Sequence, residues 1–386
     1  MPLTVDRRRD AARTTRNALQ AQLDRYLPDE AYRNYFRWAL SARNPERALF
    51  CRIIALTQLG NLTAAMLSGL PGKDDWHTRL RCAVPVNLYQ IFEVVSDNLG
   101  LGLATVPPGA DSELRDLLLD FNAIAVADLC RPTDRPAADL LAELAPRCAR
   151  LGGAERNLVP HFHAAVARRY AGEGIGPSSD ATTAALWSGL AANLESGRDV
   201  LASIAGTRTE ALVRARTVQR YSAVGRTLTA PDLTRADLVA SGRDAILVVP
   251  TLGYFGAVFN EISLSDRGYR TALDSGLLER AFDTAALLVR LQNDIGTTLL
   301  RQSAGQRAEF VAKCRATYPS ESHGTAIDLL VRAAAEPELN RFRKDLRHGE
   351  FNICLYEVHR CRFAGRGAGG VCRRTRLLCR PLSVAE

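Results

Sequence analysis

The sequence predicts an all-α protein built as a helical bundle. Apolar residues recur every three or four positions in nearly every segment, for example in residues 46–68 and 112–129, and this is the period of an amphipathic helix. Strand signals are nearly absent, because the best candidate, Val248–Val249, lies in a run typical of a buried helix. Turn-forming runs such as residues 70–74 separate the helical segments.

The same spacing defines each predicted helix in chain order. In residues 46–68, Ile53, Leu56, Leu59 and Leu62 follow one another at three-residue steps. The other predicted helices span residues 84–101, 112–129, 137–151, 155–171, 180–205, 208–226, 275–303, 305–317, 323–335 and 338–362.

Composition fits a globular enzyme or binding protein. The chain has 386 residues, of which 47% are apolar and 24% are charged, so it can bury a sizeable core. We predict one helical domain over residues 17–362. Residues 1–16 and 363–386 are predicted to be basic tails, flexible at the N-terminus and disordered at the C-terminus.

The net charge of +8 comes from the two ends of the chain. Residues 1–16 carry five Arg and two Asp, and residues 360–386 carry seven Arg and one Glu, so the body is almost neutral. We therefore predict no nucleic-acid partner. The basic ends are expected to be solvated tails, and contact with phosphates or anionic lipid is the alternative.

Cysteine usage and hydropathy indicate a cytoplasmic protein. The nine Cys are scattered, odd in number and form no C-x-x-C pair, which favours reduced thiols over a zinc site or a disulfide framework. The N-terminus lacks the apolar stretch of a signal peptide. The longest mostly apolar run, residues 245–259, is too short to span a bilayer, so we expect no integral membrane segment.

The chemically informative stretch is residues 287–301. Arg290, Asn293, Thr297 and Arg301 follow at steps of three, four and four residues, which would place them on one face of a continuous helix. Buried polar groups need partners, so this stripe either bonds to a neighbouring helix or serves a ligand.

The wording of this stretch resembles the second metal-binding motif of class I terpene synthases, R-L-x-N-D-[LI]-G-T. The matching residues are Arg290, Leu291, Asn293, Asp294, Ile295, Gly296 and Thr297. The resemblance implies the all-α terpene synthase fold, with Asn293 and Thr297 as Mg²⁺ ligands and Arg290 as a diphosphate contact. The family's Glu position holds Arg301 here.

Residues 228–259 resemble the family's helix pair around its broken effector helix. The resemblance implies a helix break at Ser241–Gly242, with Gly242 relieving the backbone and Arg243 sensing diphosphate. The alternative is a plain helix-loop-helix with Gly242 as the cap. Tyr254 and Phe255 could stabilise a carbocation through their ring faces, although core packing is the favoured role for each.

The family's first motif, D-D-x-x-D, corresponds to residues 127–131, where only Asp128 survives and Arg131 replaces the last acid. Each motif thus has an Arg in place of a carboxylate. Because fewer carboxylates bind fewer Mg²⁺ ions, we hypothesise that Arg131 and Arg301, with Arg290, hold diphosphate in place of part of the metal cluster. Asp128 remains a candidate ligand for a second Mg²⁺, and a solvated helix end is its alternative role.

The remaining candidates concern the pocket. Phe121 and Trp187 could line it, although core packing is again favoured. Asn352, Tyr356 and Arg360 would share a face of the last long helix and could close the pocket mouth.

The predicted function is a class I terpene cyclase that ionises a prenyl diphosphate, C15, C20 or bicyclic, and rearranges the carbocation. One alternative is a prenyltransferase of the same fold that acts on an amine or an aromatic acceptor. The other is a non-catalytic helical protein that binds a prenyl diphosphate or another protein.

Overall fold

The computed structural model is entirely helical in its regular elements. No strand occurs in the residues that it describes, which confirms the all-α class. The described residues are 5–69, 76–104, 112–151, 166, 169–170, 172–173, 184–229, 234–262, 266–318, 332–348 and 351–355.

The chain divides into two compact units, and each is described by itself. Unit 1 comprises Met1–Gly102, Asp116–Val218 and Pro250–Ser275, and unit 2 comprises the remaining stretches. Both units combine segments that are far apart in the sequence. The single helical domain over residues 17–362 stays a prediction.

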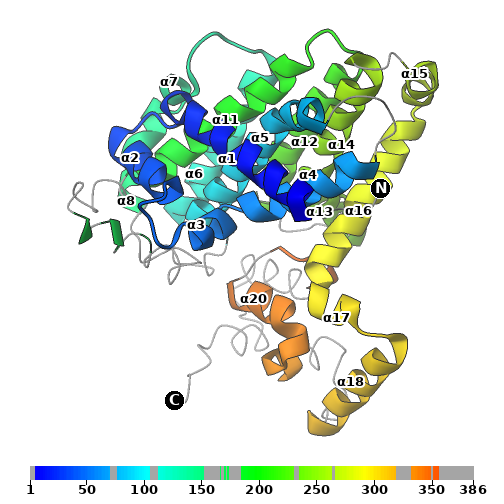
Figure 1. The fold of residues 1–386 in the computed structure, drawn as a ribbon. Coiled ribbons are helices and arrows are strands. Elements are labelled where there is room, and N and C mark those ends of the chain that lie inside the picture. Colours follow the sequence, from blue (N-terminus) through cyan, green and yellow to red (C-terminus); the bar gives the residue numbers. More distant parts are fainter. Residues whose placement is uncertain are drawn as a thin grey trace. The chain divides into compact units, whose positions relative to one another are not determined.

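Unit 1 contains most of the helices from the first two thirds of the chain (Figure 1). Residues 116–130 of α6 and residues 209–218 of α12 belong to it. Its helices are α1 (Val5–Tyr26), α2 (Glu30–Leu40), α3 (Arg47–Ile53), α4 (Leu56–Gly69), α5 (Trp76–Ala104), α6 (Ser112–Cys130), α7 (Ala137–Leu140), η1 (Ala142–Leu144), α8 (Ala145–Leu151), α11 (Ala185–Ser203), α12 (Thr209–Thr229), α14 (Val248–Gly256), η3 (Ala257–Ile262) and α15 (Arg267–Asp274).

The N-terminal residues form a helix rather than the predicted flexible tail. Ala11, Thr15, Leu19 and Leu23 recur at four-residue steps and are all buried, so α1 packs along α4, α2 and α11. The tail prediction is wrong for residues 5–16, because the buried helical stripe already begins at Ala11.

The predicted helix over residues 46–68 is two helices. α3 and α4 meet at 67°. Ala55 lies between them with φ 58°, a left-handed conformation that ends α3 and redirects the chain. This bend turns α3 away from the line of α4.

Aromatic rings fill the core of unit 1. Phe36 and Phe50 meet edge to face with centroids 5.0 Å apart, and Tyr26 meets Phe92 in the same way at 5.3 Å. Such edge-to-face pairs add to the stabilisation from burial. The core therefore rests on residues from α1, α2, α3 and α5.

Unit 2 is built mainly from the C-terminal third of the chain. Capping boxes fix the start of two helices: Thr234 bonds reciprocally with Asp237, and Ser303 with Gln306. A small apolar cluster around Phe310, Phe342 and Leu355 forms one core. The helices are α13 (Arg235–Asp244), α16 (Leu277–Ile295), α17 (Thr297–Arg301), α18 (Ala304–Thr317), η4 (Ala333–Ala335), η5 (Pro337–Leu339), α20 (Asn340–His348) and η6 (Ile353–Leu355).

Membrane-spanning length was tested helix by helix. Among the described residues, no single helix is both long and apolar enough to cross a membrane, and only two helix pairs, α3 with α4 and α13 with α14–η3, pass by length and composition when combined.

Candidate functional site

The motif helix is interrupted at Gly296. α16 ends at Ile295, Gly296 has φ 87° and ψ 148°, and α17 restarts at Thr297 (Figure 1). A Cβ on Gly296 would lie 2.8 Å from Cβ of Arg341, so this position needs glycine for both conformation and space. The predicted continuous helix over residues 275–303 is wrong, and Arg290 and Asn293 do not share one helix face with Thr297 and Arg301. The Thr297 side chain lies outside the described part of the structure.

Arg290 is buried against the C-terminal segment. Its Nε donates a hydrogen bond to Oδ2 of Asp294 at 3.0 Å, and its Nη2 donates to the carbonyl oxygen of Phe351. The guanidinium carbon also lies 5.4 Å from the centroid of the Phe351 ring. Arg290, predicted to contact diphosphate, therefore binds Asp294 and Phe351 in this structure.

Asp294 is fully buried and anchors the same segment. Its Oδ2 also accepts a hydrogen bond from the backbone N–H of Ile353 at 2.8 Å, and its carbonyl oxygen accepts one from Asn352 at 2.9 Å. Burial raises the pKa of Asp294, while the Arg290 guanidinium and the Ile353 N–H oppose that rise. Asp294 thus connects α16 to residues 352–353.

These contacts extend into a closed network, which we call the buried ion cluster: Arg290, Asp294, Arg341, Asp345 and Asn352. Nδ2 of Asn352 also donates to Oδ2 of Asp345 at 2.6 Å, and Nε of Arg341 lies 3.1 Å from that oxygen. Two guanidinium groups balance two carboxylates that are almost completely buried. Internal pairing of this kind compensates the cost of taking the charges out of water.

Gly242 permits the close approach of this segment to α13. A Cβ at this position would overlap the Ile353 side chain and come within 3.0 Å of Cε1 of Phe351. The structure therefore brings three of the predicted site residues, Gly242, Arg290 and Asn352, into one neighbourhood in unit 2. Asp294, Asp345 and Phe351 complete it, and sequence analysis did not single these out as site residues.

The helix break predicted at Ser241–Gly242 is wrong. α13 continues through both residues to Asp244, and the non-helical link to α14 comes after that residue. Arg243, predicted to sense diphosphate, is ion-paired: its Nε donates to Asp244 at 2.7 Å and its Nη1 lies 3.4 Å from Oδ2 of Asp283.

The long helix predicted over residues 338–362 is also wrong in part. α20 ends at His348, residues 351–352 are not helical, and η6 is a single short turn. Asn352 is buried in the ion cluster rather than placed at a pocket mouth. Tyr356 and Arg360 lie outside the described residues.

Asp128, in unit 1, is paired with an arginine. Its side chain is 3% exposed, and Nε of Arg198 on α11 donates to its Oδ2 at 2.7 Å while Nη2 donates to Oδ1. Arg198 lies 70 residues away in the sequence, and no motif pointed to it. A carboxylate in a two-point guanidinium pair has few lone pairs left for a metal.

The aromatic candidates are packed in unit 1. Phe121, Tyr254 and Phe255 are buried, and the hydroxyl group of Tyr254 donates to the carbonyl oxygen of Cys82 at 2.7 Å. Nε1 of the half-buried Trp187 donates to the carbonyl oxygen of Leu141 at 3.0 Å. Their side chains contribute to packing, and a role in lining a ligand pocket stays a prediction.

Three predicted site residues keep unengaged side chains. Asn293, Arg301 and Arg131 are exposed, and their side chains form no hydrogen bond or ion pair with another described residue. Asn293 and Arg301 lie in unit 2, and Arg131 lies just beyond the end of α6 in unit 1. They are the candidates that remain available to a ligand.

The donor set does not fit the magnesium cluster that the resemblance implies. Mg²⁺ needs oxygen ligands in near-octahedral geometry, usually with one or two carboxylates. Asp128 is held by Arg198, and Asp294 is held by Arg290 and Ile353. Within the described ranges, no three His, Cys, Asp or Glu side chains gather in a way that could hold a metal ion.

Comparison with protein-family models, with curated proteins and with solved structures finds no match to this chain. The arrangement itself supports two kinds of chemistry: internal charge pairing at the buried ion cluster, and anion binding at the exposed Asn293 and Arg301.

Proposed function

We propose that this chain binds a prenyl diphosphate and ionises it, as a class I terpene cyclase does. The single observation that carries the proposal is the order of residues 290–297, which matches the family's second motif at seven positions in an all-α chain. The proposal goes beyond what the comparisons support.

In this proposal, the diphosphate is held by side chains that have no partner within the described protein. Arg301 stays charged at every physiological pH and can bind two phosphate oxygens at once, and Asn293 can donate through its amide group. Arg290 and Asp294 act as positioning residues, since they fix the end of α16 beside Asn293. This assignment revises the predicted role of Arg290.

The reaction begins with cleavage of the bond between the prenyl C1 and the diphosphate oxygen, and the electron pair leaves with diphosphate. Cationic donors stabilise the charge that develops on this leaving group. The allylic cation then rearranges in apolar surroundings that exclude water, and it ends by losing a proton or by capturing a water molecule.

A substrate panel tests the proposal. The full chain is incubated with C10, C15, C20 and bicyclic prenyl diphosphates in the presence of Mg²⁺, and the readouts are gas chromatography and diphosphate release. We expect a hydrocarbon or alcohol together with diphosphate. Release of neither from any member of the panel would contradict the proposal.

Two further measurements examine the arginine hypothesis. Arg301→Gln is expected to lower kcat/KM by about tenfold or more, because one guanidinium–phosphate contact is lost. Arg315→Gln, at an exposed arginine on α18 of the same unit, is the matched control and should change nothing. Partial turnover should survive EDTA, and complete loss at trace chelator would count against phosphate binding by arginine.

A second candidate is favoured by the engagement of Arg290 and Asp128 in internal ion pairs. This candidate is a protein that binds a prenyl diphosphate without ionising it, and it predicts saturable binding with no diphosphate release. Product formation that depends on an added amine or aromatic acceptor would instead assign the chain to prenyl transfer.

A further inference from the structure

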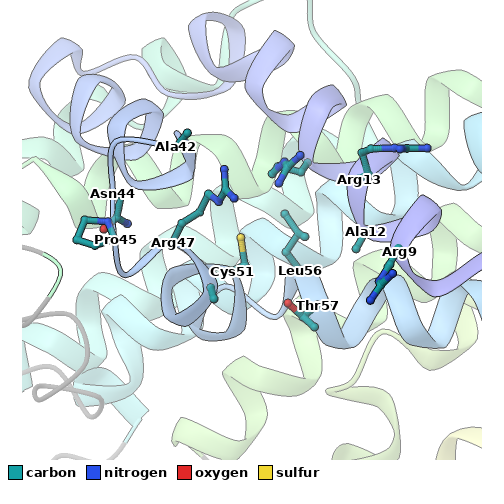
Figure 2. Close-up of a pocket in the computed structure, with 12 residues that line it drawn as sticks. Arg9, Ala12, Arg13, Ala42, Asn44, Pro45, Arg47, Cys51, Leu56 and Thr57 are labelled. Atoms are coloured by element: carbon teal, nitrogen blue, oxygen red, sulfur yellow. The ribbon is translucent and has the colours of Figure 1, made fainter. Parts of the chain in front are cut away.

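Unit 1 contains a recess of about 550 Å³ between α1, the turn before α3, and the beginning of α4. Four arginines line it: Arg9, Arg13 and Arg16 from α1, and Arg47 from α3. In Figure 2, Arg47 stands on one side and Arg9 and Arg13 on the other, with Cys51 and Leu56 between them. Its size is in the usual range of small-molecule sites, about 300–1,000 Å³.

The positive charge in this recess is largely uncompensated. Arg13 pairs with Asp10 at 2.6 Å. The side chains of Arg9, Arg16 and Arg47 form no hydrogen bond or ion pair with any described residue, and no acidic residue lines the recess. Converging like charges repel one another, so an anion bound among them would lower the electrostatic energy of the folded protein.

The backbone that carries these arginines is firmly held. Gly60 of α4 lies so close to α1 that a Cβ there would be 2.9 Å from Ala12. Below this contact, Asn87 bonds to Thr15 at 3.0 Å and to Thr63 at 2.9 Å, which ties α1 and α4 to α5. Three of the four arginines therefore project from a fixed helix.

The turn before α3 is equally well anchored. The buried side chain of Asn44 donates to the carbonyl oxygen of Ala39 at 2.8 Å and accepts from the backbone N–H of Glu46 at 2.9 Å. These bonds hold the start of α3, and with it Arg47, in place. A site on rigid elements costs less entropy when a ligand binds.

The floor of the recess is apolar. Leu56 is 3% exposed and Cys51 is 8% exposed. Burial raises the pKa of the Cys51 thiol, and Arg16 and Arg47 act in the opposite direction, which shows that both guanidinium groups reach the surroundings of this floor.

We propose that this recess binds the diphosphate group of a small organic molecule. Three unpaired guanidinium groups match the several negative charges of a diphosphate better than the one or two of a phosphate. The apolar floor suits an organic substituent. A long nucleic acid would need a stripe of positive charge along the surface, whereas these charges converge on one hollow. The recess shares no residue with the motif around Arg290, so this inference does not rest on the proposed function.

Calorimetric titration of the full chain with inorganic diphosphate tests the proposal. We expect diphosphate to bind more tightly than inorganic phosphate, with an affinity that falls as salt is added. Arg16→Gln and Arg47→Gln should each raise Kd by at least about tenfold, because each removes one charged contact. Arg8→Gln, at an exposed arginine of α1 outside the recess, is the matched control and should leave Kd within about twofold.

A variant that keeps every charge separates shape from charge. Ala48 lines the recess and is exposed, so Ala48→Trp should fill the hollow and weaken binding without disturbing the core. Circular dichroism melting curves confirm that each variant is folded. Titrations with ADP and with farnesyl diphosphate then distinguish a nucleotide from an isoprenoid as the organic part.

Three results would overturn the proposal. The first is the absence of binding for inorganic diphosphate, ADP and farnesyl diphosphate alike. The second is an equal loss of affinity in the Arg8→Gln control, which would indicate a general charge effect. The third is binding of a short RNA, weakened by Arg16→Gln, without binding of any small diphosphate.

Discussion

Two arginine-rich regions of this molecule use the same side chain in opposite ways. In the buried ion cluster of unit 2, Arg290 and Arg341 lie among buried carboxylates and are neutralised by them. In the recess of unit 1, Arg9, Arg16 and Arg47 form no bond to a described residue. The comparison teaches that the partner of a guanidinium, rather than its place in a motif, distinguishes a structural arginine from one open to a ligand.

The largest expected effect is at Asp294. Asp294→Ala leaves the buried Arg290 without its counter-ion, and breaking a buried pair in this way costs about 3–5 kcal/mol. Urea unfolding followed by circular dichroism measures the loss. Asp274→Ala, which removes the partner of Arg208 in an exposed pair, is the control and should cost less than about 1 kcal/mol. Equal losses would show that the cluster is not the anchor described here.

The next effect is steric. Gly242→Ala places a methyl group against Ile353 and Phe351, and overpacking of this kind costs about 1–3 kcal/mol. Gly69→Ala, at a position with open space around the new methyl group, is the matched control and should be close to neutral. The measurement is again the free energy of unfolding. A neutral result at Gly242 would mean that residues 351–353 do not pack on α13 as described.

The pH dependence of stability should carry the signature of Asp294. Because burial raises its pKa in the folded state, the folded protein binds the proton more tightly than the unfolded chain. The wild type should therefore lose stability relative to Asp294→Asn as the pH rises from the ordinary carboxyl pKa through the raised value. The slope is at most about 1.4 kcal/mol per pH unit. Parallel pH profiles of the two proteins would contradict this assignment.

The smallest effect on stability is expected at the recess. Arg16→Gln and Arg47→Gln should leave the free energy of unfolding unchanged or raise it by up to about 0.5 kcal/mol at low salt, since each relieves repulsion and breaks no pair. Thermal melts at low and high salt check this. A loss comparable to that of Asp294→Ala would mean that these arginines are structural and would remove the contrast between the two regions.

Sequence periodicity was sufficient for the fold class and for most helices, because amphipathic spacing is a local property. It failed where a distant contact decides the local structure. Gly296 was interpreted as part of a helix, yet its conformation depends on the approach of Arg341. The bend at Ala55, which brings Arg47 into the recess, has no signal in the apolar spacing of residues 46–68.

The two arginine regions differ in the same respect. The four-residue step from Arg290 to Asp294 is visible in the sequence, but their partners at Phe351 and Ile353 are not. The excess of arginine in residues 1–16 was visible too, and contact with phosphates was considered and set aside in favour of a solvated tail. Ala11 and Thr15 belong to the buried stripe of α1, and this is the observation that changes the interpretation.

The order in which the chain is synthesised gives the anchoring of residues 351–353 a further consequence. α16 emerges from the ribosome more than fifty residues before Phe351, Asn352 and Ile353, which supply its hydrogen bonds. Until that stretch appears, Arg290 and Asp294 have only each other, and α16 and α13 cannot complete their packing. A premature stop codon or a proteolytic cut ahead of residue 351 would leave that packing permanently unfinished.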